Sequence, residues 1–452
     1  MDSEREIPQA WGLLEMERPG PQTAASCAAV DYCKTPMHDE ARDRKRGDQP
    51  APVERIALLT GGGDRPYALG LAGSLIAEGI CLDFIGSDEL ESPELRSNPQ
   101  VRVLNLRGDA RPEASVVTKI ARVTRYYARL LLYAASARAR IFHILWNNRL
   151  EFLDRTLIPL YYRLLGKRLV LTVHNVNARR RDGNDSSANR LTLRIQYRLV
   201  DHLFVHTAQM KRELQEEFGI SDAKISVIPF GINSTVPDTA LTTFEARQRL
   251  GLDRSDRTVL FFGNIVPYKG LEYLVEAMAL VVGRVPNCRL VIAGRPKGHE
   301  TYWQSIRQRV ADLNLDSVVI QRIEYVPDAD TEIYFKAADV LVLPYTHVFQ
   351  SGVLFLGYNF GLPAIATDVA SLKDDVVDGC TGYVCAPRDP TALARTIERY
   401  FSSELYQDLP TRRTEIRRFA AERHSWATVG ELTKNVYRRL QSSDAHLVAE
   451  EN

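Results

Sequence analysis

The stretch from Leu341 to Asp368, LVLPYTHVFQSGVLFLGYNFGLPAIATD, constrains the fold more than any other part of this sequence. The short apolar run Val340 to Leu343 has the length of a buried strand, and Pro344 stops it. A polar loop follows, then an apolar helical pattern from Val353 to Phe360 and a second strand pattern from Ala364 to Thr367. This order of strand, loop, helix and strand predicts one unit of a parallel sheet.

The loop of this unit is a candidate binding site. It ends in Gln350, Ser351 and Gly352, where the carboxyl end of the strand meets the amino end of the helix. The first backbone N–H groups of a helix have no partner within the helix, so they suit an anion such as a nucleotide diphosphate. An ordinary turn between strand and helix is the alternative that this stretch alone leaves open.

Composition limits the function classes. The chain has 452 residues, enough for two domains, and a net charge of +1, so the whole molecule implies no nucleic-acid partner. Its six cysteines are scattered without a CxxC pair, which favours reduced thiols and no bound metal. The acidic start MDSEREIP carries no secretory signal, and no apolar run reaches about 18 residues. We therefore expect a cytoplasmic protein.

Strand and helix patterns alternate twice along the chain and predict an α/β protein with two Rossmann-like parallel-sheet domains facing across a cleft. Residues 1–53 are rich in proline and charge and are predicted to be a disordered extension. The first domain is expected at 54–236 and the second at 237–420. A C-terminal helix is expected at 421–441 and a frayed tail at 442–452.

The first domain opens with the strand Arg55 to Thr60, followed by Gly61, Gly62, Gly63 and a helical pattern. The glycine spacing is not GxGxxG, and no acidic residue closes the second strand to bind a ribose. A tight turn that lets another group approach the backbone is the better interpretation of these glycines.

Seven stretches in the expected order resemble the retaining glycosyltransferases of family 4. They are LVLTVHN (169–175), KISVIPFGIN (224–233), FFGNIVPYKGLEYLVEA (261–277), RLVIAGRP (289–296), YFKAADVLVLPY (334–345), FGLPAIATDV (360–369) and DGCTGYVCAPRDPTALA (378–394). The resemblance covers roughly 55–440. It implies the GT-B fold, with the acceptor in the first domain, the nucleotide-sugar donor in the second, and the last helix crossing back to the first. It also implies transfer of a hexose from a nucleotide diphosphate sugar to a glycan or lipid-linked acceptor in polysaccharide or glycolipid biosynthesis, without metal or cofactor.

The resemblance assigns catalytic roles to Lys269 and His174. Lys269 matches a lysine beside the donor diphosphate, where a fixed cation stabilises the charge that builds on the leaving group. His174 matches a histidine near the donor sugar, able to bond a sugar hydroxyl or position the acceptor. The family's arginine near the lysine is replaced by Asn264, and Arg295 is a candidate to compensate. The loop Gly61, Gly62 and Gly63 falls near the donor phosphates and the acceptor.

The chain departs from the family where two glutamates commonly stand eight residues apart. These positions fall on Val348 and Leu356, so both carboxylates are missing. A divergent donor site, a non-catalytic scaffold that binds nucleotide sugar or glycan, and a shifted alignment all remain open, as does a sugar-nucleotide epimerase of the same fold. The expected donor-binding residues are Gly263, Asn264, Lys269, Arg295, Gln350, Ser351, Gly352 and Val353.

The segment Ser115 to Arg140 is basic and contains no acid. Its cations are Lys119, Arg122, Arg125, Arg129, Arg138 and Arg140, and Tyr126, Tyr127, Leu130, Leu131, Leu132 and Tyr133 are interleaved with them. Arg179, Arg180 and Arg181 follow in a later loop. Such a helix could lie on the inner face of an anionic membrane, or it could pack on the sheet with a solvated basic face.

Overall fold

The computed structural model describes residues 55–62, 64–90, 92–108, 115–148, 150–232, 236–348 and 350–450. The predicted disordered extension at 1–53 and Gly63 lie outside the described residues.

The first half of the described chain forms a seven-stranded parallel sheet, called sheet A here. Its strand order is β3-β2-β1-β4-β5-β6-β7. The bounds are β1 Ile56–Leu59, β2 Leu82–Gly86, β3 Val101–Asn105, β4 Ile141–Ile144, β5 Arg168–Thr172, β6 His202–Val205 and β7 Ile225–Val227. The central strands are buried on both faces because helices cover both sides, which is why they read as continuous apolar runs rather than alternating ones.

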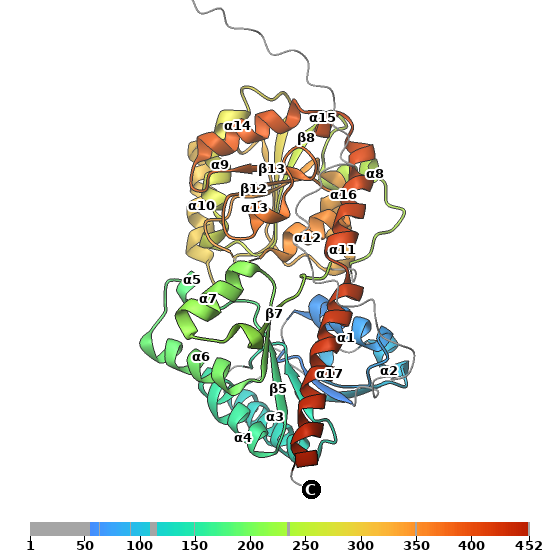
Figure 1. Ribbon diagram of the computed structural model, residues 1–452. Helices are drawn as coiled ribbons and strands as arrows, with labels where there is room; N and C mark the ends of the chain where they lie inside the picture. The colour runs from blue at the N-terminus through green and yellow to red at the C-terminus, as the bar shows by residue number, and fades with distance from the viewer. Residues whose placement is uncertain are drawn as a thin grey trace, which may run out of the picture. The chain divides into compact units, whose positions relative to one another are not determined.

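Two helical layers cover sheet A (Figure 1). One layer consists of α1 Arg65–Ala77 together with the C-terminal helix α17 Trp426–Glu450. The other consists of α3 Val116–Ser136, the π-helical segment η2 Leu153–Leu157, α4 Ile158–Leu164, α6 Ser187–Leu199 and α7 Ala208–Phe218. Short helices α2 Pro93–Ser97 and α5 Ala178–Arg181 and the turns η1 Asp88–Leu90 and η3 Asp222–Lys224 complete this half.

The second half of the described chain forms a six-stranded parallel sheet, sheet B, in the order β10-β9-β8-β11-β12-β13. The bounds are β8 Arg257–Phe262, β9 Cys288–Ala293, β10 Val319–Arg322, β11 Val340–Leu343, β12 Ala364–Thr367 and β13 Gly382–Cys385. The unit that the sequence predicted at 341–368 is confirmed, with β11 pairing parallel to β12 and α12 Gly352–Asn359 between them.

Two apolar cores flank sheet B as well. One contains α9 Leu271–Val281, α10 Glu300–Asp312, α14 Pro390–Phe401 and α15 Glu404–Gln407. The other contains α8 Thr243–Leu250, α11 Asp328–Ala337, α12, and α16 Leu409–Arg423. The short elements η4 Pro267–Lys269 and α13 Leu372–Asp375 lie in loops. Both halves are therefore doubly wound α/β layers, as predicted.

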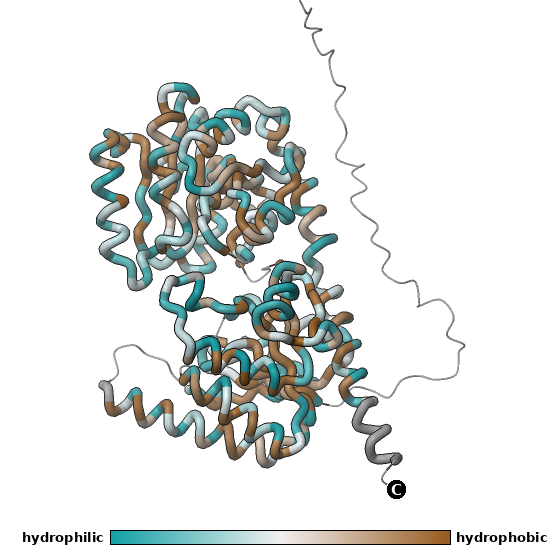
Figure 2. Tube along the Cα trace, turned by 60° about the vertical axis from the view of Figure 1, so that its left-hand side comes forward, coloured by the Kyte–Doolittle hydropathy of each residue, from teal (hydrophilic) through white to brown (hydrophobic). Residues whose placement is uncertain are grey.

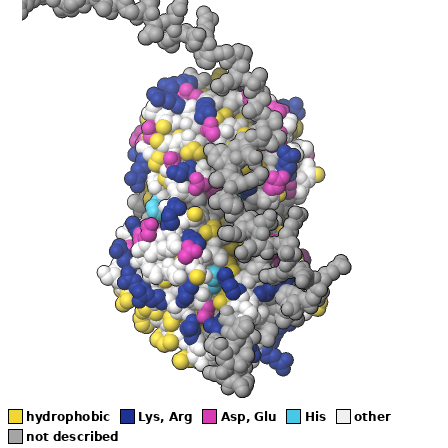
Figure 3. All heavy atoms as spheres, in the orientation of Figure 1, with side chains coloured by type: hydrophobic (Ala, Val, Ile, Leu, Met, Phe, Trp, Pro, Cys, Tyr) yellow, Lys and Arg dark blue, Asp and Glu magenta, His cyan; other side chains and the backbone are white. Residues whose placement is uncertain are grey.

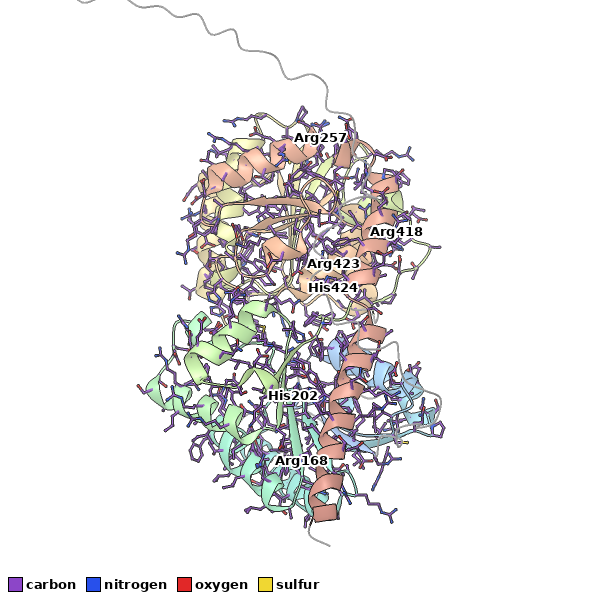
Figure 4. All side chains as sticks on the ribbon, viewed as in Figure 1. Arg168, His202, Arg257, Arg418, Arg423 and His424 are labelled. Carbon is purple, nitrogen blue, oxygen red and sulfur yellow. The ribbon has the colours of Figure 1, made fainter. Side chains whose placement is uncertain are left out.

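The last helix, α17, packs on sheet A although it follows the helices of sheet B. The Tyr437 hydroxyl and His143 Nδ1 share a hydrogen bond of 2.6 Å. Lys434 Nζ donates to the Glu78 carbonyl at 2.7 Å. Figure 4 labels His424 where α16 and α17 meet. The chain therefore returns to the first half at this junction.

Three features of the helices differ from the sequence predictions. The helix α7 was missed, and so was α8, although Thr242 and Glu245 form a capping box at its start. The helix α17 runs to Glu450, past residue 442 where a frayed tail was predicted. No glycine or proline follows Gly430 before Glu450, so nothing in the sequence ends the helix earlier.

Candidate active site

Lys269 ends the short turn η4 after β8, and its side chain is buried. Its Nζ lies 3.5 Å from the Phe262 carbonyl oxygen and over the ring faces of Phe261 and Tyr345, at 6.0 and 5.6 Å from their centres. Burial lowers the pKa of this ammonium to about 8. The side chain is thus a cation held in a poorly solvated place at the carboxyl end of β8.

Glycines bring the loops around Lys269 close together. Gly263 has φ +98°, and a Cβ there would lie 2.9 Å from Lys269 Nζ and 3.5 Å from Val353 Cγ2. Gly294, after β9, has φ +146°, and a Cβ there would lie 1.9 Å from the Gly263 carbonyl oxygen. Gly263, Lys269 and Val353 of the predicted donor set therefore meet at one edge of sheet B, where parallel sheets bind ligands.

The amino end of α12 forms the other side of this place. Ser351 is the N-cap, and its buried Oγ accepts from the Leu354 amide at 3.3 Å. The amides of Gly352 and Val353 belong to the first turn, so they have no acceptor within the helix. Gln350 Oε1 is a buried oxygen without a hydrogen-bond partner in the described part of the chain. The first turn of α12 and the buried ammonium thus lie at the same edge of sheet B, on either side of Gly263.

Val348 and Leu356, the two positions at which the resemblance would place glutamate, are apolar and largely buried. Val348 and Leu356 are both 7% exposed and belong to the core between sheet B and α12. A carboxylate at Leu356 would be a buried charge, whereas Val348 also lines the groove described below.

Two members of the predicted donor set lie further out. Asn264 is exposed. Arg295 is also exposed, and its guanidinium lies 5.1 Å from the centre of the Tyr325 ring, beyond the end of β10. Its backbone oxygen, rather than its side chain, joins the site loop, because it accepts from the Ile265 amide at 2.9 Å. The proposed compensation by Arg295 gains no support from this position of the side chain.

His174 lies at the carboxyl end of β5 within an aromatic cluster. Its ring stacks on Trp146 at 4.2 Å with an interplanar angle of 4°, and Tyr67 meets it edge-on at 4.7 Å. His174 Nδ1 lies 3.2 Å from His206 Nε2, and His206 Nδ1 lies 3.3 Å from the Ile228 carbonyl. Burial, and next the neighbouring His206, hold the pKa of His174 well below its ordinary value. The imidazole is neutral at pH 7 and able to bond a hydroxyl rather than to supply a cation.

The glycine loop after β1 touches this cluster. Gly61 has φ +59°, and a Cβ there would lie 2.1 Å from the Trp146 carbonyl oxygen, so only glycine fits. Arg107, after β3, donates from Nη1 to the Gly61 carbonyl at 2.7 Å. Gly62 faces the same guanidinium, since a Cβ there would lie 1.7 Å from its Nη1. The loop therefore makes the tight approach that the sequence predicted for Gly61 and Gly62.

Phe230 connects the residues of the two halves. Its ring lies 5.4 Å from Tyr67 and 5.1 Å from His206 in the first half. It also stacks on Phe355 of α12 at 5.7 Å, and one ring carbon lies 4.0 Å from the Cβ position of Gly352. The His174 cluster and the amino end of α12 are thus two sides of one region.

A groove of 570 Å³ opens beside this region. It is lined by Asn177, Arg180, Gln209, Arg212, Glu213, Glu216 and Glu217 of the first half and by Thr346, His347, Val348, Val369 and Ala370 of the second. The Thr346 amide donates to the carbonyl of Tyr268, the residue before Lys269. Burial, and next Glu217, raise the pKa of Glu213 to about 7. The groove is large enough for a sugar and adjoins the predicted donor site.

Sequence reasoning missed Arg107, Trp146 and Phe230. Each follows a strand, and parallel strands bring their carboxyl ends to one edge, so this position was the available signal. Two further polar residues of the first half have structural partners: Asn177 caps α5 by accepting from the Arg180 amide, and His143 lies buried between Tyr437 and Thr172. Within the described residues, no group of three His, Cys, Asp or Glu side chains is placed to hold a metal ion. No helix in the same residues is long and apolar enough to cross a bilayer.

The two sheets are those of the GT-B fold, and solved structures share them. Sucrose-phosphate synthase from Thermosynechococcus elongatus superposes with a TM-score of 0.69 at 20% identity, over 86% of this chain and 100% of that one. HepE from Anabaena, solved in complex with UDP-glucose, superposes with a TM-score of 0.64 at 16% identity, over 86% of this chain and 99% of that one. At these identities the likeness shows the fold alone.

Two family models match in chain order. Glycosyltransferase Family 4 matches residues 63–236, and Glycosyl transferases group 1 matches residues 256–403. The chain belongs to this family of glycosyltransferases. One curated relative, a D-inositol 3-phosphate glycosyltransferase from Kineococcus radiotolerans, is 29% identical over 256 residues, which are 53% of this chain and 57% of the relative. The chain thus spans about half the length of the curated relatives it matches.

Proposed function

We propose that this chain is a retaining glycosyltransferase that moves a hexose from a nucleotide diphosphate sugar to a glycan or lipid-linked acceptor. The observation that carries the proposal is Lys269, a buried ammonium beside the free amides of α12. Within the part of the chain that the structure describes, its Nζ contacts a carbonyl oxygen and two aromatic rings and forms no ion pair, so a bound anion would be its first full charge partner. A diphosphate leaving group suits such a place.

The chemistry follows from this position. As the bond between the anomeric carbon and the phosphate oxygen breaks, negative charge grows on the diphosphate, and Lys269 and the amides of α12 stabilise it. As the resemblance implies, the acceptor oxygen attacks the same face of the sugar, and the leaving phosphate takes the acceptor proton. His174, being neutral, bonds a sugar hydroxyl or positions the acceptor. No general base is required.

The named relatives suggest which compounds to test first. HepE was solved with UDP-glucose, and the curated relatives are named D-inositol 3-phosphate glycosyltransferases. UDP-glucose therefore comes first among donors, and D-inositol 3-phosphate joins the acceptors to be screened. GDP and ADP sugars remain necessary comparisons, because the positions of the two family glutamates are apolar here.

A second candidate is a scaffold that binds nucleotide sugar without turnover. The observation that favours it is the burial of Val348 and Leu356, which removes both carboxylates of the donor site. Binding of a donor together with the absence of transfer and of donor hydrolysis would support this candidate over the enzyme.

Calorimetry tests the donor site. Wild type is titrated with UDP, GDP, ADP and their sugar conjugates, and we expect one nucleotide class to bind. Lys269→Met should weaken that binding by about 10- to 100-fold, as expected for one charge-assisted hydrogen bond of about 1.5–3 kcal/mol. The matched control is Lys211→Met, since Lys211 pairs with Asp222 on the surface at 2.8 Å and should leave donor affinity unchanged.

Turnover is measured with the donor that binds. NMR of the product should show that the anomeric configuration of the sugar is retained, and His174→Gln should lower kcat more than donor affinity. Equal donor affinity in wild type and Lys269→Met, with both proteins folded, would refute the assigned site.

A further inference from the structure

Exposed hydrophobic side chains are concentrated in one part of the first half. Among the described residues, sixteen large hydrophobic side chains are exposed, and ten of them lie between Val117 and Leu191. Of these ten, the most exposed are Leu164 at 78%, Val117 at 77%, Leu132 at 70%, Ile120 at 62% and Phe152 at 61%. They lie on or next to α3, η2 and α4. Exposed apolar residues scattered singly are normal, whereas a contiguous patch marks an interaction surface.

These elements lie side by side, so the residues form one patch. Tyr161 of α4 donates from its hydroxyl to the Leu131 carbonyl of α3 at 3.3 Å. Arg155 of η2 donates to the Asn189 side chain of α6 at 2.8 Å. Figure 3 shows hydrophobic side chains gathered beside Lys and Arg side chains where Figure 1 draws α6 and α4. We call this patch on α3, η2, α4 and α6 the apolar–basic surface.

The residues of this surface are not those that the sequence suggested. Tyr126, Tyr127, Leu130 and Tyr133 of α3 are buried against sheet A, and Tyr133 donates to Asp83 at 2.8 Å. These side chains are core residues, so the prediction that they could meet a membrane was wrong for them. The opposite, exposed face of α3 is apolar as well, and it carries Val117, Ile120, Ala121, Ala128 and Leu132. Figure 2 shows hydrophobic residues along the whole length of this helix.

The charge on α3 is of one sign, whereas the neighbouring Glu151 is paired with Arg155 and Arg179. The segment Ser115–Leu150 contains seven Lys and Arg residues and no Asp or Glu. Arg125 and Arg129 are exposed and lie one helical turn apart on the same face as Leu132. A second copy of this chain would bring like charges together, which disfavours a dimer through this patch. An anionic partner with an apolar interior fits better.

One end of the surface lies near the candidate site. Leu150 and Phe152 follow Trp146, which stacks on His174, within the segment that leaves the carboxyl end of β4. The Leu150 amide meets the Tyr127 hydroxyl at 3.4 Å, which ties this segment to α3. A ligand held against this surface would therefore be close to the part of the first half that carries His174.

We propose that the apolar–basic surface docks on an anionic phospholipid bilayer. The exposed leucine, isoleucine, valine and phenylalanine side chains enter the headgroup boundary, and Arg125 and Arg129 bind lipid phosphates. Amphipathic surfaces of this kind bind through buried apolar area and through attraction to anionic lipids, which salt screens. The inference does not rest on the proposed function, since it concerns a surface outside the donor site.

Vesicle flotation tests the proposal. The full chain is mixed with vesicles of phosphatidylcholine containing 30 mol% phosphatidylglycerol, or of phosphatidylcholine alone, at low and at high salt. Binding is expected to anionic vesicles and to fall at least tenfold at high salt or without phosphatidylglycerol. Arg125→Gln with Arg129→Gln should weaken binding at least tenfold, and so should Leu157→Ser with Leu164→Ser.

The control is Leu280→Ser with Leu313→Ser, two exposed leucines of the second half that should leave vesicle binding unchanged. Donor-nucleotide binding and thermal unfolding of every variant show that it is folded. No flotation of wild type with anionic vesicles at low salt would overturn the proposal. So would equal binding by all variants, or a dimer in solution that Leu157→Ser with Leu164→Ser dissociates.

Discussion

At the residue scale, the buried ammonium group of Lys269 lowers the stability of the folded protein. A buried lysine without a carboxylate loses its hydration and regains little, and its lowered pKa expresses that cost. Functional sites commonly retain such destabilising groups, and their removal stabilises the protein while activity is lost. The site assignment therefore makes a prediction about stability that does not depend on knowing the donor.

Lys269→Met should raise the free energy of unfolding of the ligand-free protein at pH 7. The pKa falls from 10.5 to about 8 on folding, which corresponds to a gain on the order of 3 kcal/mol when the charge is removed. Between pH 8 and 10.5 the unfolded state binds more protons at this group, so wild type should gain stability over that range relative to the variant. Urea unfolding at pH 7, 9 and 10.5 measures the difference. A variant less stable than wild type at pH 7 would contradict the prediction.

At the element scale, the strands of both sheets could be predicted because buried parallel strands are short apolar runs. The helices α7 and α8 were missed although the sequence carried signals for both. In α7, Met210, Leu214 and Phe218 are spaced by four on one face, with Thr207 as the N-cap and Gly219 at the C-terminal end. For α8, the capping box at Thr242 and Glu245 was a usable signal.

The loops that form the site pack closely only because they contain glycines. A family motif can indicate where these glycines stand in the sequence, but their contacts are seen only in the fold. Gly294→Ala should destabilise the protein by at least about 3 kcal/mol, because φ +146° suits only glycine and a Cβ would meet the Gly263 carbonyl at 1.9 Å. Because Gly263 lies next to Lys269, donor binding should weaken as well. Denaturant unfolding and calorimetry measure both effects.

Gly283→Ala is the matched control for this substitution. Gly283 follows α9 in the same half, has no positive φ, and has open space around its Cβ position. It should be neutral or stabilise by up to about 1 kcal/mol. If Gly294→Ala behaved like Gly283→Ala, the close packing of the loops after β8 and β9 would be wrong.

At the scale of the whole molecule, the sequence could predict two doubly wound sheets and the residues at their carboxyl edges, but not the contacts between residues far apart in the chain. Phe230 shows the limit. Its place after β7 was predictable, whereas its stacking on Phe355 and its contact with His206 depend on how the sheets and helices pack. Similarly, the family motif located Arg295, but the side chain lies over Tyr325 rather than beside Lys269.

The chain passes from one half to the other twice, once after β7 and once where α16 meets α17. Residues of these two passages form hydrogen bonds with each other. The Ile232 amide donates to the His424 carbonyl at 3.2 Å, and Trp426 Nε1 donates to the Ile232 carbonyl at 2.7 Å. The indole also fills the space left by two glycines, Gly70 of α1 and Gly231, where a Cβ would lie 2.2 Å from it. Trp426 thus fixes the start of α17 to both the first half and the other passage.

Trp426→Ala should therefore lower the free energy of unfolding by about 3 kcal/mol, because it removes a large ring from a fitted site and one hydrogen bond. Trp426→Phe keeps most of the ring and loses the bond to Ile232, so its cost should be nearer about 1 kcal/mol. We expect the free energy of unfolding, measured in urea, to fall in the order wild type, Trp426→Phe, Trp426→Ala. The two differences separate the contribution of the hydrogen bond from that of the packing of the ring. Equal stability of wild type and Trp426→Ala would mean that the passages are joined by other contacts, and the anchoring role of this tryptophan would be wrong.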